Sequence, residues 1–174
     1  IGDDMTDEDA FLAVRCAGGA GVLVGAPRPS AAVHRLDDAA AVTILGTPAA
    51  RLDAGARRAL GLGFVPEERL GRGAVPEMSL AENALLTGWR ERMVAWGFVR
   101  AQTVREYAAE TIRDYGVKAG GPDAAARSLS GGNLQKYIVG REIRQRPRVM
   151  IAAQPTWGVD VGAAAQIRAE LLAL

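Results

Sequence analysis

The stretch Leu129-Ser-Gly-Gly-Asn-Leu-Gln-Lys136 decides the fold, because a loop enters a helix there. The helix pattern continues until Pro147, which ends it. The first amides of a helix have no partners within it, and the helix dipole adds about half a positive charge. Two glycines let another molecule approach this backbone, and a serine hydroxyl can donate to it. The stretch therefore predicts a small phosphate-sized anion site; the alternative is a glycine-rich helix start with Ser130 as an ordinary N-cap.

The segment after Pro147 predicts a parallel sheet. Val149 to Ala153 is an apolar run that we expect to form a strand buried on both faces. The loop Gln154-Pro-Thr-Trp-Gly-Val-Asp160 follows, and a last helix begins near Gly162. A helix, a buried strand and a second helix in this order indicate an α/β fold.

The region before the quoted stretch predicts short elements of both kinds. Ser79 is expected to cap one of its helices, with Glu82 at the third position as in a capping box. The expected elements are strands at Val42 to Leu45 and Gly63 to Pro66, and helices at Leu52 to Leu60, Ser79 to Trp89 and Arg100 to Tyr115.

Three motifs, in the order and spacing that they have along this chain, together resemble one family. Leu129 to Lys136 is similar to the signature motif of ABC ATPases, in the L-S-G-G-N-x-Q-K form typical of bacterial sugar and nucleoside importers. Val149 to Asp160 resembles their Walker B strand and D-loop. The segments Gly63 to Gly73 and Met78 to Asn83 together resemble the region after the Q-loop strand in the second half of these duplicated ATPases. The resemblance implies an incomplete P-loop NTPase-like ABC ATPase domain over residues 42–174. Within it we expect a helical subdomain at about 79–127, and the signature helix and Walker B-like strand within 129–160.

The resemblance also implies which residues touch ATP. In this family the signature loop of one domain meets the γ-phosphate held by the phosphate loop of a second domain. Asp160 falls at the D-loop aspartate; the alternative, compatible role is a cap for the final helix. The expected nucleotide contacts are Ser130, Gly131, Gly132, Asn133, Gln135 and Asp160.

The chain departs from the family at the positions that hydrolyse ATP. No G-x-x-x-x-G-K-[ST] phosphate loop is present. Ala153 and Gln154 stand where the family has the Asp that holds Mg²⁺ and the Glu that polarises water, and Glu67 stands at the Q-loop glutamine. An alanine cannot bind a metal, and a glutamine amide cannot take a proton. We therefore expect no intact catalytic residues and no hydrolysis by this chain alone, with ATP and Mg²⁺ as the family's cofactors.

The partners implied by the family are a second ATPase half with an intact Walker A and transmembrane permease subunits. This places the chain in the cytoplasm, peripheral on the inner face of the plasma membrane. Trp89, Trp96 and Phe98 in the helical subdomain are candidates for exposed residues that dock on the permease; the alternative is that they pack within the subdomain.

Composition excludes several other classes. The chain has 174 residues, 49% hydrophobic and 24% charged, with a net charge of +1, which argues against a nucleic-acid partner. The basic run Arg141 to Arg148 is accordingly interpreted as a solvated helix end. Cys16 is the single cysteine, so no internal disulfide is possible. The sequence contains no run of about 18 apolar residues, so no membrane span is predicted, and no signal peptide is recognised.

The first residues show a second resemblance. Ile1-Gly-Asp-Asp-Met-Thr-Asp-Glu-Asp-Ala-Phe11 is similar to the last acidic motif of trehalose-phosphate phosphatases, in the haloacid dehalogenase superfamily. The resemblance implies a short βαβ-like remnant of that fold over residues 1–41, with Asp3 and Asp4 as Mg²⁺ ligands. The alternative is an acidic helix start. The D-x-D nucleophile of that family is missing, which argues against phosphatase activity.

We therefore expect an ATP-binding component of an ABC importer for simple sugars or nucleosides, present as a fragment. The chain begins at Ile1 and stops within the apolar helix pattern Ile167 to Leu174, which suggests that both ends are cut. Two alternatives stay open: a fragment of a Mg²⁺-dependent trehalose-phosphate phosphatase, or a chimeric product without function.

Overall fold

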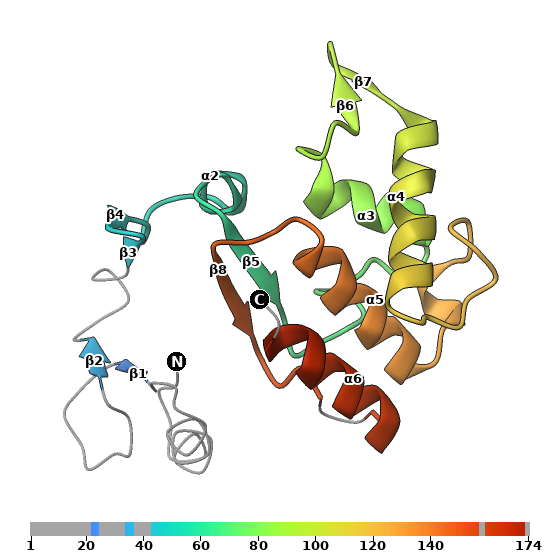
Figure 1. The fold of residues 1–174 in the computed structure, drawn as a ribbon. Coiled ribbons are helices and arrows are strands. Elements are labelled where there is room, and N and C mark those ends of the chain that lie inside the picture. The colour runs from blue at the N-terminus through green and yellow to red at the C-terminus, as the bar shows by residue number, and fades with distance from the viewer. Residues whose placement is uncertain (1–21, 25–33, 37–42, 157–158, 173–174) are drawn as a thin grey trace. The chain divides into compact units, whose positions relative to one another are not determined.

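The structure, a computed structural model, describes residues 22–24, 34–36, 43–156 and 159–172 (Figure 1). The chain divides into two compact units, Ile1–Leu60 and Gly61–Leu174. The sequence prediction placed a boundary earlier, between residues 41 and 42. Cys16, the acidic motif Ile1 to Phe11 and its proposed ligands Asp3 and Asp4 lie outside the described residues.

In the first unit, the described residues form short paired strands and the helix α2. Strands β1 (Val22–Val24) and β2 (His34–Leu36) pair in parallel. Strands β3 (Thr43–Ile44) and β4 (Thr47–Pro48) form an antiparallel hairpin, so the strand predicted from Val42 is present. Helix α2 (Ala54–Ala59) begins at Asp53, whose Oδ1 accepts a hydrogen bond from the Ala56 amide at 2.7 Å. This confirms the short helix predicted from Leu52.

The second unit contains the elements around the quoted stretch. Every helix predicted there is present, displaced by at most a few residues at its ends. The elements are β5 (Leu62–Val65), α3 (Leu80–Gly88), β6 (Val94–Ala95), β7 (Phe98–Val99), α4 (Ala101–Asp114), the 3₁₀ helix η3 (Ala126–Ser128), α5 (Gly131–Ile143), β8 (Val149–Ala152) and α6 (Val161–Leu172).

Strands β5 and β8 form a parallel pair, with Leu62 opposite Val149. A Cβ atom at Gly63 would lie 2.7 Å from the Met150 sulfur and 3.0 Å from the Pro147 Cβ, so a larger residue there would require these side chains to shift. The prediction that β8 is buried on both faces is wrong, because Ile151 is 38% exposed and Phe64 on β5 is 43% exposed. The described residues place no third strand in this sheet, so part of its apolar surface stays open.

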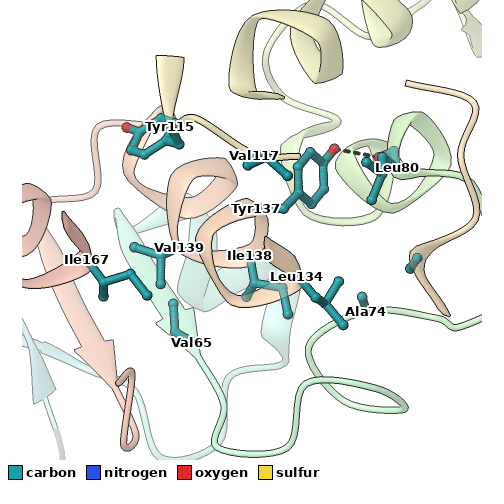
Figure 2. Packing of buried hydrophobic residues seen from close by; sticks show 11 residues of the cluster. Val65, Ala74, Leu80, Tyr115, Val117, Leu134, Tyr137, Ile138, Val139 and Ile167 are labelled. Carbon is teal, nitrogen blue, oxygen red and sulfur yellow. Dashed lines mark hydrogen bonds between the residues drawn. The ribbon is translucent and has the colours of Figure 1, made fainter. Parts of the chain in front are cut away.

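Helix α5 lies at the centre of the core of this unit (Figure 2). Tyr137, which is fully buried, donates a hydrogen bond from its hydroxyl to the Leu80 carbonyl at 2.6 Å and so joins α5 to the start of α3. A smaller cluster joins α3 to α4. The core around α5 consists of Val65, Ala74, Leu80, Tyr115, Val117, Ala126, Leu134, Tyr137, Ile138, Val139 and Ile167.

The basic run at the end of α5 is not simply a solvated helix end, and that prediction is wrong for two of its arginines. Arg141 is 2% exposed and donates to the carbonyls of Gly73, at 2.9 Å, and Asn83, at 3.1 Å. Arg144 pairs with Asp114 at 2.7 Å and also with Glu110. Both arginines lie three residues apart on the helix face that packs on α3 and α4, and a count of charges cannot identify that face.

No helix in the described part of the chain is long and apolar enough to span a membrane.

Candidate functional site

The start of α5 is open to solvent. Ser130 is its N-cap, with φ −62° and ψ 154°, but its side chain makes no capping hydrogen bond. Ser130 and Gly131 are exposed, and Gly132 is half-buried. Among the described residues, nothing accepts a hydrogen bond from the amide of Gly131 or Gly132. Two donors at the positive end of a helix dipole therefore remain available for an anion, and the ordinary-cap alternative for Ser130 lacks its defining bond.

Asn133 organises the loop around this helix start. Its Nδ2 donates to the Ser130 Oγ at 2.9 Å, and its Oδ1 accepts from the Lys118 amide at 2.9 Å. Since the Ser130 oxygen accepts this bond, its hydroxyl hydrogen can still be donated to a ligand. The structure thus places Asn133 beside the site, where it orients Ser130.

Gln135 lies away from the site. Its side chain is 1% exposed, and its Oε1 accepts a hydrogen bond from Arg69 Nε at 3.2 Å. Gln135 lies five positions after Ser130, which is about 1.4 turns of helix and places it on the inward face. The sequence also allowed Gln135 to reach the neighbouring loop instead of the ribose, and its bond to Arg69, in the loop after β5, fits that alternative. A contact between Gln135 and a nucleotide stays a prediction.

Gly132 packs directly against the turn before α6. A Cβ atom at Gly132 would lie 3.2 Å from the Asp160 Oδ2 and 3.7 Å from the Ala163 Cβ. Asp160 caps α6, because its Oδ1 accepts a hydrogen bond from the Ala163 amide at 2.9 Å. That amide, aided by the charge of Lys136, holds the pKa of the Asp160 carboxyl below its usual value. The helix-cap role is therefore present in the structure, and the role across a dimer stays a prediction.

Two open clefts meet at Glu67. One, of about 520 Å³, extends from the start of α5, and its lining includes Gly131 and Glu67. The other, of about 680 Å³, lies beside the end of β8, and its lining includes Ala153 and Glu67. Gln154, which follows Ala153, is exposed with a positive φ of 43°. Glu67 and Ala153, the predicted Q-loop and Walker B positions, thus line one cleft, and Glu67 also lines the cleft at the start of α5.

These residues fit an anion contact but not a metal site. The methyl group of Ala153 and the amide of Gln154 offer neither a carboxylate ligand nor a base. In the ranges that the structure describes, no group of three or more His, Cys, Asp or Glu side chains could hold a metal ion. The chain's own Walker B position therefore does not fit Mg²⁺.

The sequence analysis did not predict a buried polar cluster in this unit, formed by Asn83, Arg141 and Glu142. Asn83 is fully buried, accepts from the Val75 amide at 2.7 Å and donates to the carbonyls of Val75, Met78 and Ser79. Buried Arg141 and Glu142 pair at 3.2 Å beside it. This cluster fixes the loop between β5 and α3 against α5. The sequence signal for this cluster was weak: Asn83 is an uncharged polar residue within the mostly apolar helix pattern Leu80 to Leu86.

Comparisons with known proteins agree with this geometry, although no family model matches the chain. The chain is 42% identical over 112 residues to the nucleoside import ATP-binding protein NupA of Lactococcus lactis subsp. cremoris, covering 64% of the chain and 22% of that protein. It is 36% identical over 170 residues to the ribose import ATP-binding protein RbsA 1 of Streptomyces avermitilis, covering 94% of the chain and 32% of that protein. The chain therefore spans about a fifth to a third of the length of these relatives.

Solved structures identify the class of fold. The dimeric bacterial ABC transporter cassette MJ0796 superposes with a TM-score of 0.57 at 19% identity, covering 73% of the chain and 54% of that cassette. Its post-hydrolysis dimer bound to ADP and Pi gives a TM-score of 0.55 at 22% identity, covering 70% and 51%. The fold is that of part of an ABC ATPase cassette, an α/β fold of the P-loop NTPase type. In sequence, the chain is similar to the ATP-binding proteins of sugar and nucleoside ABC importers.

The comparisons do not support the phosphatase-like remnant expected over residues 1–41. None of the relatives named above is a phosphatase. The alignment with RbsA 1 covers 94% of the chain and therefore extends well into this segment.

Proposed function

We propose that the chain is part of the ATP-binding component of an ABC importer for simple sugars or nucleosides, and that it contributes the signature motif to a composite ATP site. The observation that supports this most strongly is the exposed start of α5, where the amides of Gly131 and Gly132 face no acceptor among the described residues. Two amides and the Ser130 hydroxyl form a set of donors suited to a terminal phosphate. The names of the relatives support the importer class and both solute classes.

The proposal divides the work between two halves. The partner half supplies the phosphate loop that holds ATP with Mg²⁺, and the metal neutralises phosphate charge when bound. This chain supplies neutral donors at Ser130, Gly131 and Gly132, while Ala153 and Gln154 leave its own site without a metal ligand or a base. The chain alone is therefore inactive as an ATPase.

The proposal also implies a cellular location and binding partners for the chain. It is cytoplasmic and peripheral on the inner face of the plasma membrane, bound to permease subunits and to a second ATPase half. The relatives are named as import proteins, and the cassette with the same fold was solved as a dimer.

Sedimentation of the full chain with a partner ATPase half that has an intact phosphate loop tests the proposal. We expect association that requires ATP and that weakens about 10- to 100-fold in Ser130→Arg, because the long side chain blocks the phosphate from the Gly131 and Gly132 amides, whose bonds to it are worth about 1.5–3 kcal/mol. Ala109→Arg adds the same side chain at an exposed position of α4 and serves as the matched control. Equal binding by Ser130→Arg and the control, or association without ATP, would contradict the proposal.

A further inference from the structure

The β6–β7 hairpin of the second unit has an unusual turn. Val94 pairs with Val99 and Ala95 with Phe98, so Trp96 and Gly97 form the two-residue turn, with φ 54° and 82°. Such turns favour Asn or Asp at the first position. The left-handed conformation is strained for a residue with a Cβ, because the Cβ approaches the following carbonyl oxygen. Trp96 is 98% exposed, so packing within the chain does not offset this strain.

The apolar side chains of the hairpin face solvent. Phe98 is 78% exposed and Val99 is 54% exposed. Met93 at the base of the hairpin is fully buried, and its carbonyl accepts a hydrogen bond from the Arg100 amide at 2.7 Å. The base is therefore anchored while the tip projects beyond α3 and α4 (Figure 1). The alternative that Trp96 and Phe98 pack within the subdomain is wrong.

Positively charged residues flank the hairpin in the sequence, on the side of its base. Arg90, Arg92 and Arg100 are exposed and form no salt bridge with any residue that the structure describes. The Arg90 guanidinium lies 4.7 Å from the centre of the Trp89 ring. Glu91 is the one acidic residue between positions 89 and 100, so this segment has an excess of two positive charges.

We propose that this hairpin inserts its tip into the headgroup region of an anionic lipid bilayer. Tryptophan favours that depth because its ring is apolar and its N–H can bond to headgroups. Arginines behind the tip would meet lipid phosphates, each gaining about 1 kcal/mol near an anionic surface. The tip is a projecting point that borders neither cleft described above. A fluid bilayer accommodates such a shape, whereas a protein partner would need a matching groove. The proposal does not depend on the signature-motif function.

The test uses the full chain with vesicles of phosphatidylcholine alone or mixed with phosphatidylglycerol. We expect sedimentation with the mixed vesicles and a blue shift of tryptophan emission. The double variant Trp96→Ser/Phe98→Ser should bind about tenfold or more weakly, because burial of one aromatic side chain is worth about 1.5–3 kcal/mol. Arg92→Gln and Arg100→Gln should each weaken binding about fivefold, and only on the anionic vesicles.

A matched control removes equally exposed apolar side chains elsewhere in the same unit. Val161 and Leu172 are 88% and 86% exposed, so Val161→Ser/Leu172→Ser should bind vesicles as the parent chain does. Circular dichroism checks that each variant is folded. The proposal is overturned if the hairpin variant binds as well as this control. It is also overturned if the parent chain ignores vesicles but binds detergent-solubilised permease through Trp96 and Phe98, which would make the tip a protein-docking surface.

Discussion

Two helices of the second unit begin with the same residue in nearly the same conformation, yet their starts differ. Ser79 caps α3 with φ −62° and ψ 161°, and Ser130 precedes α5 with φ −62° and ψ 154°. At α3 the Ser79 Oγ accepts from the Glu82 amide at 3.1 Å, and the Glu82 carboxylate accepts from the Ser79 amide at 2.8 Å. At α5 neither bond exists.

The third residue after each serine accounts for the difference. Glu82 is long enough to reach back to its N-cap amide, which closes the start of α3. Asn133 instead bonds to the Ser130 hydroxyl oxygen and to the Lys118 amide. An N-cap serine therefore does not by itself close a helix start. Its neighbour decides whether the first amides are satisfied internally or are left for a ligand.

The largest effect on stability should come from Asn83, whose side chain bonds to the Ser79 carbonyl at the start of α3. Asn83→Ala should lower the free energy of unfolding by about 2 kcal/mol, because the Val75 amide loses its acceptor while the carbonyls of Val75, Met78 and Ser79 keep only their backbone donors. Urea unfolding measures this. Leu86→Ala on the same helix, where Leu86 is 50% exposed, is the control and should cost far less. Similar losses in both variants would show that the cluster contributes little.

The open start can be closed by design. Asn133→Glu supplies the third residue of a capping box and places a carboxylate where a phosphate would bind. We expect ATP-dependent association with a partner half to fall about tenfold or more, while the free energy of unfolding changes by less than about 1 kcal/mol. Asn133→Gln, which adds length without charge, is the matched variant. Undiminished association of the glutamate variant would argue against an anion at this position.

Removal of each serine hydroxyl measures the two caps directly. Ser79→Ala should cost about 1 kcal/mol, since a capping bond to the Glu82 amide is lost. Ser130→Ala should cost less than about 0.5 kcal/mol, because that side chain caps no amide. Thermal unfolding of the two variants under identical conditions gives the comparison. An equal cost at both positions would remove the distinction between the helix starts.

The smallest expected effect is a dependence on pH. The amide and hydroxyl of Ser79 donate to the Glu82 carboxylate and hold its pKa below the usual 4.5. A carboxyl whose pKa is lower in the folded state stabilises the fold above the pKa of the unfolded chain, and this stabilisation is lost as the pH falls through the folded value. The difference in stability between the parent and Glu82→Gln should therefore shrink as the pH falls below 4.5. A difference that stays constant would contradict the capping box.

Local features of the fold could be predicted from the sequence, and long-range ones could not. The Ser79–Glu82 box and the helix start after Ser130 depend on residues within one helical turn, and both are present. Burial of Gln135 depends on which face of α5 packs against the rest of the unit, and the motif does not contain that information. Likewise, Ile151 in an apolar run appeared fully buried, but its exposure depends on the strands beside it.

The missing side chain at Gly132 has a mechanical consequence. Since the Asp160 carboxylate and Ala163 occupy the space that a Cβ would need, the backbone around Gly132 and the first turn of α6 are in direct contact. Steric contact of this kind leaves little slack, because packed atoms resist compression. We therefore expect a shift of the backbone at Gly132 to displace Asp160 and the first turn of α6. The starts of α5 and α6 would then move together.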